Sequence, residues 1–439
     1  MHFLASIVLL WLCSGLYAQE PTPNPAPPND IVDLSAVAAE DSSASQPHVR
    51  IIDVTKFPKK TPLLGRILLA PFRAIAPKAN AGLTFLEENK GLNPLEAILR
   101  DPVIHPVFGN LGDGSGFGFG FYASTADKLS KKFSLFTQHR YTTKKYLESA
   151  GGMLFKPFPE SRLGAQVSLT GTYRLRPEED FWGIGPNSLK SERSTYNLEE
   201  RQVGVTVSAT VLKNLRAGVG LSYSSNSVFD GKDPRFATTQ EVFGQRGLPG
   251  LAEGAALLGT SAFLEYEGRD EPSHPRTGAY GNFSVTNNDS VGRGDFGFVN
   301  YRLDVRGYVP LGTKRRTLAV RLLGDFNTEK GGSRIPFFRL ARLGDQTTLR
   351  GYDTYRFHGK NAVLGTAEYR YQLVQGIEAL GFVDVGQVFN RRSEFSAANL
   401  TATFGGGISF SSSRTTAFKI LVAQSPEGAR LFFTFGPTF

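Results

Sequence analysis

The amino-acid sequence predicts an all-β fold, a transmembrane antiparallel β-barrel of about 16 strands that follows a short N-terminal periplasmic or helical segment. From about Leu111 to the last residue, apolar and polar side chains alternate with a period of two, which is typical of strands. Beyond the N-terminus, no apolar stretch approaches the length of a membrane-spanning helix. The mean hydropathy of −0.20 agrees with spanning strands, in which outward apolar residues balance inward polar ones.

The chain begins with a segment that is typical of a secretory signal peptide. An apolar run from Phe3 to Leu12 leads to small residues, and cleavage is expected near Ala18, which would remove residues 1–18. An uncleaved membrane anchor is the alternative, although the run is short for a bilayer span. Residues 19–47 are rich in Pro, Ser, Ala and Asp and predict a disordered or extended linker.

Residues 48–106 are expected to form a short helical segment in the periplasm or a plug in the barrel. Helical patterns run from Pro62 to Ile75 and from Asn93 to Arg100. The first pattern is amphipathic, so this segment would either pack on the periplasmic rim or lie inside the barrel. The barrel itself is then expected to occupy residues 107–439.

Composition restricts both the chemistry and the partners. Cys13 is the only cysteine and follows bulky Leu12 inside the expected signal peptide, so we expect neither a lipid anchor nor disulfides in the mature chain. The chain has 49 Lys and Arg against 40 Asp and Glu, but the basic residues are scattered and form no nucleic-acid patch. Outer-membrane lipid and lipopolysaccharide phosphates fit this charge balance better, and the expected location is the bacterial cell outer membrane.

The alternation also indicates which strand face is polar. Between Val299 and Arg306, the charged residues Arg302, Asp304 and Arg306 share one face of the expected strand. The predicted helices are too few to cover the apolar face of so large a sheet, so we expect lipid to cover it. Closure into a barrel would also remove exposed strand edges.

The strand count follows from the length of the alternating region. About fifteen strands can be placed between Gly114 and Phe439, and about 330 residues divided by a unit of about 20 gives about sixteen. Since both termini of such bacterial barrels lie in the periplasm, the number should be even, and the remaining strand is expected near Val103 to Phe108. Long connections are expected at Arg176 to Arg193, Val228 to Ala256 and Thr328 to Lys360.

The last of these connections contains the motif Leu349-Arg350-Gly351-Tyr352. Residues of a kind usually buried, placed in a long connection, suggest a loop that folds back and docks inside the barrel. Gly351 lets the backbone turn tightly, and Arg350 offers a planar five-donor fork that can hold a carboxylate bidentately in a wet lumen.

Other motifs accompany this loop motif. They are Phe181-Trp182-Gly183-Ile184-Gly185-Pro186-Asn187-Ser188, Arg269-Asp270 followed by Pro275-Arg276-Thr277-Gly278, Ile335-Pro336-Phe337-Phe338, Glu368-Tyr369-Arg370, and Gly381 to Val388. Together they resemble the motifs of the BamA/TamA-like (bacterial surface antigen) family of outer-membrane barrels. The resemblance implies insertion or translocation of proteins. Members usually carry polypeptide-transport-associated (POTRA) domains before the barrel, but residues 48–100 contain no strand-turn-strand pair, so we expect none here.

The resemblance further implies that Arg350 reaches down the lumen to an acidic residue on a following strand. The matching position is Asp384, and Glu368 is a second candidate. Alternation independently places Asp384 on the lumen face, opposite to Val383 and Val385, where a carboxylate and a guanidinium would each favour a partner. The alternative is that both charges are simply solvated.

The strands expected at the two ends of the barrel carry aromatic residues on one face. These residues are Phe117, Phe119 and Phe121 near the start, and Phe433, Phe435 and Phe439 at the end. A terminal aromatic residue resembles the recognition signal of outer-membrane barrels. The two strands must pair to close the barrel, and glycines in the first would make a weak seam, where the family is thought to open laterally. Glycines that only permit close packing or twist are the alternative.

No pattern indicates catalysis. The six histidines include no pair at metal-ligand spacing, and no nucleophile elbow occurs, so we expect no catalytic residues, no metal and no cofactor. The leading hypothesis is insertion or translocation of proteins or other cargo. Its partners would be client outer-membrane or secreted proteins and a separate periplasmic protein. The alternatives are a passive pore or structural barrel without assembly activity, and a surface adhesin that uses the long loops.

Overall fold

The computed structural model describes residues 104–112, 114–125, 130–292, 294–313, 315–374, 376–411 and 416–435. The expected signal peptide, the linker, the helical patterns and Phe439 lie outside these residues, as does the region where POTRA domains are expected to be missing. Within the described part, no helix has the length and apolar character needed to cross a membrane.

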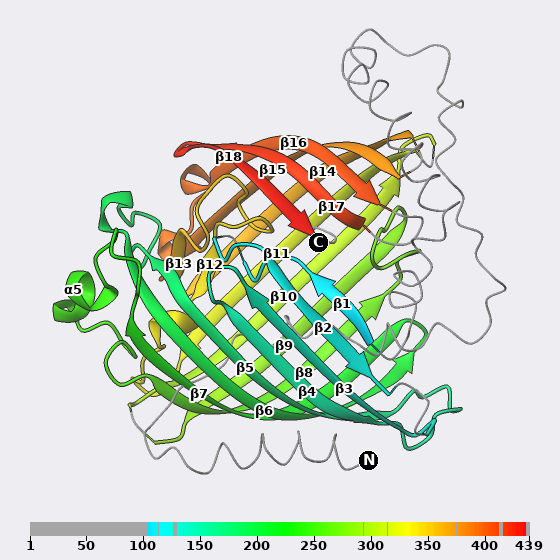
Figure 1. The fold of residues 1–439 in the computed structure, drawn as a ribbon, viewed down its shortest axis with the longest axis horizontal. Coiled ribbons are helices and arrows are strands. Elements are labelled where there is room, and N and C mark those ends of the chain that lie inside the picture. The colour runs from blue at the N-terminus through cyan, green and yellow to red at the C-terminus, as the bar shows by residue number, and fades with distance from the viewer. Residues whose placement is uncertain are drawn as a thin grey trace, which may run out of the picture.

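The described residues form an antiparallel sheet of 16 strands, in which each strand pairs with the next along the chain and β11 pairs with β14. The strands are β1 (Ile104–Phe108), β2 (Gly118–Ser124), β3 (Phe133–Thr142), β4 (Leu147–Phe155), β5 (Gln166–Phe181), β6 (Ser194–Leu212), β7 (Leu215–Asp230), β8 (Ala255–Glu267), β9 (Gly278–Ser290), β10 (Gly297–Pro310), β11 (Arg316–Glu329), β14 (Asn361–Val374), β15 (Ile377–Phe389), β16 (Thr401–Ser411), β17 (Thr416–Ser425) and β18 (Gly428–Phe435). The sheet curls around an interior, as Figure 1 shows. The predicted all-β barrel and its count of sixteen strands are therefore confirmed. β1 is the strand expected near Val103 to Phe108, so the described part of the sheet already includes Ile104, ahead of the start expected at residue 107.

The remaining elements lie in the connections. Within the β11–β14 connection, β12 (Ala341–Leu343) and β13 (Phe357–Gly359) form a separate two-stranded sheet. The short helices are η4 (Lys190–Glu192), α5 (Thr239–Phe243), η5 (Gly244–Arg246), η6 (Phe337–Arg339), η7 (Arg392–Glu394) and η8 (Ala397–Asn399). In Figure 1, α5, β12 and β13 lie at the same end of the barrel.

The two ends of the barrel differ in the length of their connections. The longest connections, β5–β6, β7–β8, β11–β14 and β15–β16, all lie at one end because the strands alternate in direction. We call this end the loop rim. The opposite end, which carries the short connections β6–β7, β10–β11 and β14–β15, is called the turn rim. In bacterial outer-membrane barrels the long loops are extracellular and the short turns periplasmic.

The outer face of the barrel is apolar and the inner face is polar. On β10, Tyr301, Leu303 and Val305 are 39%, 41% and 41% exposed, whereas Asp304 between them is buried. This is the reverse of a water-soluble domain, and it is the pattern expected where lipid surrounds a polar interior.

Two apolar clusters interrupt the polar interior near the loop rim. In one, Phe337 and Phe338 of the β11–β14 connection pack with Phe181 and Tyr196 from β5 and β6. In the other, side chains of the same connection pack on the inner faces of β11, β14 and β15; this cluster consists of Leu343, Leu349, Tyr352, Phe357, Leu323, Ala362, Leu364 and Val388. The connection therefore enters the barrel, and we call residues 330–360 the lumen loop.

Candidate functional site

A sharp turn presents the motif Leu349 to Tyr352 to the inner wall of the barrel. Before the turn, one carboxylate oxygen of Asp345 accepts hydrogen bonds from the backbone N–H groups of Thr347 and Thr348, both at 2.6 Å. This side-chain turn fixes the approach of the loop. Leu349 and Gly351 then adopt positive φ angles of 40° and 104°.

Glycine is required at position 351 by the closeness of the barrel wall as well as by the positive φ angle. A Cβ atom at this position would lie 3.2 Å from the backbone carbon of Gln424 and 3.3 Å from the Cβ of Ser425. The Ser425 hydroxyl donates a hydrogen bond of 2.8 Å to the carbonyl of Gly351, which ties the loop to the end of β17. A larger residue would displace the turn from this wall.

Arg350 binds both acidic residues that the sequence analysis named. Its Nε and Nη2 donate to the two carboxylate oxygens of Asp384, each at 2.8 Å, and its Nη1 donates to Glu368 Oε2 at 2.8 Å. Its backbone N–H also donates to Asp384 Oδ2, at 3.1 Å. The three side chains are 1%, 1% and 0% exposed, for Arg350, Asp384 and Glu368 respectively. The structure thus brings together a buried, bidentate ion pair with a second carboxylate.

The environment keeps Arg350 charged. Burial alone would lower the pKa of Arg350, but the hydrogen bonds and charges of Asp384 and Glu368 raise it above its ordinary value. The guanidinium also lies 3.4 Å from the ring centroid of Phe382, in cation–π contact. Removing one partner from such a buried network costs about 3–5 kcal/mol, because the remaining charges stay desolvated.

A chain of polar contacts leads from Arg350 toward the turn rim. Glu368 Oε1 accepts a hydrogen bond of 2.7 Å from Arg370 Nε, and Arg370 Nη1 donates to the carbonyl of Pro275 at 3.3 Å. Beside it, Arg276 pairs with Glu378. The Pro275 to Gly278 motif and the Glu368 to Arg370 motif therefore meet inside the barrel. Sequence reasoning identified both motifs but missed this contact, for which neither motif gives a local signal.

The part of the lumen loop that follows the tip, residues 353–360, is joined to the Phe181 to Ser188 motif. The backbone N–H of Gly185 donates to the carbonyl of His358 at 2.7 Å. Arg356 donates to the hydroxyl and the carbonyl of Ser188, both at 2.8 Å, and to Glu427 at 2.9 Å. The ring of His358 lies 4.9 Å from that of Phe181. Two motifs far apart in the sequence thus form one assembly.

His358 is held uncharged in this assembly. It is fully buried, and neither ring nitrogen has a hydrogen-bond partner among the described residues. Burial, together with the charges of Arg342 and Arg356, lowers the pKa of His358 well below 6.5. The histidine is therefore neutral at neutral pH.

A second ion network holds the first limb of the loop, residues 330–348 before the tip, less tightly. Arg342 of β12 and Arg176 of β5 each lie 3.9 Å from Glu179, and Arg176 lies 3.6 Å from Glu200. These separations exceed hydrogen-bond length. Beside this network, a polar cavity of about 230 Å³ separates the lumen loop from the inner wall; Arg302, Arg342 and Tyr355 are among its lining residues.

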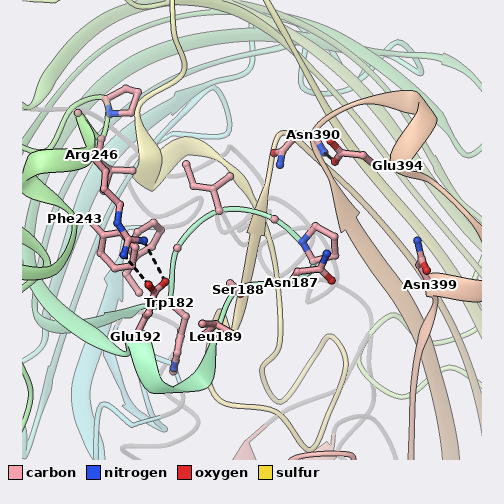
Figure 2. A pocket seen from close by; sticks show the side chains of 18 residues that line it. Trp182, Asn187, Ser188, Leu189, Glu192, Phe243, Arg246, Asn390, Glu394 and Asn399 are labelled. Atoms are coloured by element: carbon pink, nitrogen blue, oxygen red, sulfur yellow. Dashed lines mark hydrogen bonds and ion pairs between the residues drawn. The ribbon is translucent and has the colours of Figure 1, made fainter.

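Figure 2 shows a pocket on the loop rim that uses the Phe181 to Ser188 motif as a wall. Its volume is about 760 Å³. On one side Glu192 pairs with Arg246 beside Phe243, and on the other side lie Asn390 and Asn399. The motif therefore contacts the lumen loop inward and lines a pocket outward. Among the described residues, no group of His, Cys, Asp or Glu side chains has the arrangement of a metal site.

The aromatic residues expected on the two end strands face outward where they are described. The glycine-rich strand is not the end of the sheet, however, because Phe119 and Phe121 lie on β2, which pairs with β1 and β3. Phe117, Phe119 and Phe121 are 51%, 51% and 44% exposed, and Phe433 is 57% exposed. A Cβ atom at Gly120 would lie 1.8 Å from the carbonyl oxygen of His139, so this glycine permits close packing. The side chain of Phe435 and all of Phe439 lie outside the description. Their expected roles in a seam and a recognition signal stay predictions.

A curled 16-stranded antiparallel sheet with an apolar exterior and a loop anchored inside defines a transmembrane β-barrel with an occupied lumen. The model of the Omp85 superfamily domain matches residues 111–435, and the chain belongs to this superfamily. This confirms the resemblance to the BamA/TamA-like barrels at the level of the superfamily.

Solved structures agree with this assignment. BamA from Haemophilus ducreyi lacking POTRA domains 1–3 is similar with a TM-score of 0.57 and 16% identity, over 76% of this chain and 69% of that chain. CdiB from Escherichia coli is similar with a TM-score of 0.51 and 14% identity, over 76% of this chain and 62% of that chain. At these identities the similarity shows a shared fold. No curated protein matches the sequence.

Proposed function

We propose that this protein is a BamA/TamA-type barrel of the bacterial outer membrane that inserts or translocates proteins or other cargo. The observation that carries the proposal is the buried contact of Arg350 with Asp384 and Glu368, which fixes the lumen loop to the barrel wall. Membership of the Omp85 superfamily supports it. Its partners would be client outer-membrane or secreted proteins, together with the surrounding lipid and lipopolysaccharide.

In this proposal the lumen loop couples the interior of the barrel to both rims. Arg350 anchors its tip at β14 and β15, and the contact of Arg370 with Pro275 continues toward the turn rim. Arg356 ties the loop to Ser188 at the loop rim. A client that displaced the tip would disturb the contact of Arg370, because Arg370 and Arg350 share Glu368, and it would pull on the Arg356 contact, because Arg356 follows the tip in the same loop.

The end strands offer a place for lateral opening. β1 has 5 residues and β18 has 8, whereas β6 has 19 and β10 has 14. Short strands can form few ladder hydrogen bonds, so a junction between β1 and β18 would be the weakest part of the wall. Outward phenylalanines at this junction, Phe108 on β1 and Phe433 on β18, would contact lipid during opening.

Depletion of the protein, followed by quantitative proteomics of the outer membrane, tests this function. We expect client barrels or secreted proteins to fall in abundance and wild-type protein to restore them. Arg350→Ala should fail to restore them. Arg140→Ala is the matched control, because Arg140 also pairs with a carboxylate, Glu148, but on β3 and β4, away from the lumen loop. An unchanged outer-membrane proteome after depletion would contradict the assembly role.

A passive pore is the second candidate, favoured by the polar cavity beside the lumen loop. Single-channel recordings in planar bilayers separate the two functions. Steady open conductance of the wild-type barrel supports the pore, whereas conductance that appears only after removal of residues 346–353 supports a loop that closes the lumen. A surface adhesin, the third hypothesis, would use the loop-rim pocket of Figure 2.

A further inference from the structure

Three connections at the turn rim form one continuous surface. Lys132, at the end of the β2–β3 connection, accepts a backbone hydrogen bond of 2.7 Å from Lys156 of the β4–β5 connection. Leu163 of the same β4–β5 connection accepts one of 2.7 Å from Thr210, near the end of β6. The surface carries basic and apolar side chains, and we call it the basic patch: Lys131, Lys132, Lys156, Arg162, Lys213, Phe158, Leu163 and Leu212.

Within the part of the chain that the structure describes, the positive charge of the basic patch is largely uncompensated. One acidic neighbour is Glu160, which pairs with Lys131 at 3.2 Å. Among the described residues, Lys132, Lys156 and Lys213 have no acidic partner. At the β8–β9 connection of the same rim, by contrast, Arg269 is bound by Glu267 at 2.9 Å. The patch therefore presents cations to whatever lies outside the protein.

The basic patch lies where the lipid-facing surface ends. Phe155, Val207 and Val211 project outward from β4 and β6 and are about half exposed. Next to them within the patch, Phe158 and Leu212 are 63% and 67% exposed. Apolar side chains beside lysines at the end of an apolar band are typical of the membrane–water interface, where lysine stems lie along lipid and the ammonium groups reach the headgroups.

We propose that the basic patch binds the headgroups of anionic phospholipids in the membrane leaflet at the turn rim. Lipid is the occupant that fits, because the patch is continuous with the lipid-facing strands and the same membrane covers both. An acidic periplasmic protein would match the charge, but it would leave Phe158, Leu163 and Leu212 at the edge of the bilayer unexplained. Each cation near a membrane surface adds to the attraction for anionic lipid.

The test measures lipid preference at the patch itself. Phe158→Trp introduces a fluorophore there, and its signal is taken as the difference from the parent protein, in which Trp182 lies at the opposite rim. The full-length protein is reconstituted with brominated phosphatidylglycerol or brominated phosphatidylcholine, both of which quench indole fluorescence. We expect the anionic lipid to be preferred roughly three- to tenfold. The preference should weaken as the salt concentration rises.

Matched lysine variants decide the outcome. In the Phe158→Trp background, K132Q/K156Q/K213Q should abolish the preference, whereas K144Q/K145Q/K232Q, which removes exposed lysines from the loop rim, should leave it unchanged. Heat-modifiable migration on gels verifies that each variant is folded. Equal quenching by both lipids, or a preference that survives the first triple substitution, would refute the proposal. The proposal would also be refuted if inorganic phosphate removed the preference more strongly than sodium chloride does at equal ionic strength, because this would indicate a site for free phosphate.

Discussion

The lumen loop is held by two ion networks that differ in quality. At its tip, Arg350 reaches Asp384 and Glu368 through hydrogen bonds of 2.8 Å. At its first limb, Arg342 approaches Glu179 only to 3.9 Å. The tip network is fully buried and the limb network largely so, and both carry a cost of desolvation, but only the tip recovers that cost through short, aligned, charge-assisted bonds. The comparison indicates that the tip anchors the loop and that the limb can adjust its position.

Arg350→Ala should have the largest effect on the loop. The substitution leaves Asp384 and Glu368 buried without their shared partner, and we expect a loss of about 3–5 kcal/mol from loop docking. Limited proteolysis of the folded barrel should then cleave the lumen loop much faster. Arg350→Lys should recover only part of the protection, because an ammonium cannot bind a carboxylate in a bidentate manner. Unchanged protease resistance in Arg350→Ala would show that the contact does not anchor the loop.

Gly351→Ala should have the next largest effect, about 1–3 kcal/mol. The residue combines a φ of 104° with backbone and side-chain atoms of Gln424 and Ser425 close to the position of a Cβ. Gly332→Ala is the control, because Gly332 has a φ of 87° in the same loop and no atom within 4 Å of its Cβ position. Both variants carry the backbone strain of a positive φ angle, so the difference in their protease resistance measures the effect of contact with the barrel wall. Equal behaviour would mean that the wall does not constrain the tip.

Acidification should loosen the limb that contains β13. The folded-state pKa of His358 lies well below 6.5, so at lower pH the released loop binds a proton that the docked loop excludes. Docking is therefore unaffected above about pH 6.5 and weakens as the pH falls, by up to about 1.4 kcal/mol per pH unit. Proteolysis between about pH 7.5 and pH 5.5 with an acid-tolerant protease measures this. His358→Phe should abolish the pH dependence attributable to this residue, and a wild-type loop that is equally protected at both pH values would contradict the assignment.

The sequence predicted the faces of the strands better than the contacts of the loop. The period of two identifies inward and outward residues without any knowledge of neighbouring strands, so Asp384 inside and Val383 outside agree with the structure. The requirement for an even number of strands placed the first strand near its observed position, and the described part of the sheet includes Ile104, ahead of the start expected at residue 107.

The contacts that hold the lumen loop depend on tertiary structure. The Arg350 contact with Asp384 and Glu368 was suggested by a resemblance, since a pattern along one strand does not reveal how deep a distant loop reaches. The hydrogen bond from Ser425 to Gly351 and the contact of His358 with Phe181 join segments far apart in the sequence. They follow from the path of the loop through the barrel, which local residue patterns do not encode.

Arg342→Gln provides the smallest effect and the sharpest test of the comparison. Loss of an ion pair at 3.9 Å and of the cation–π contact with Tyr355 at 3.8 Å should cost about 1 kcal/mol. Arg176 remains beside Glu179, so that carboxylate keeps a basic neighbour, unlike Asp384 after Arg350→Ala. We therefore expect slightly faster cleavage near β12 with the tip still protected. If Arg342→Gln released the loop as fully as Arg350→Ala, the two networks would be equivalent and hydrogen-bond geometry would not decide which part of the loop is the anchor.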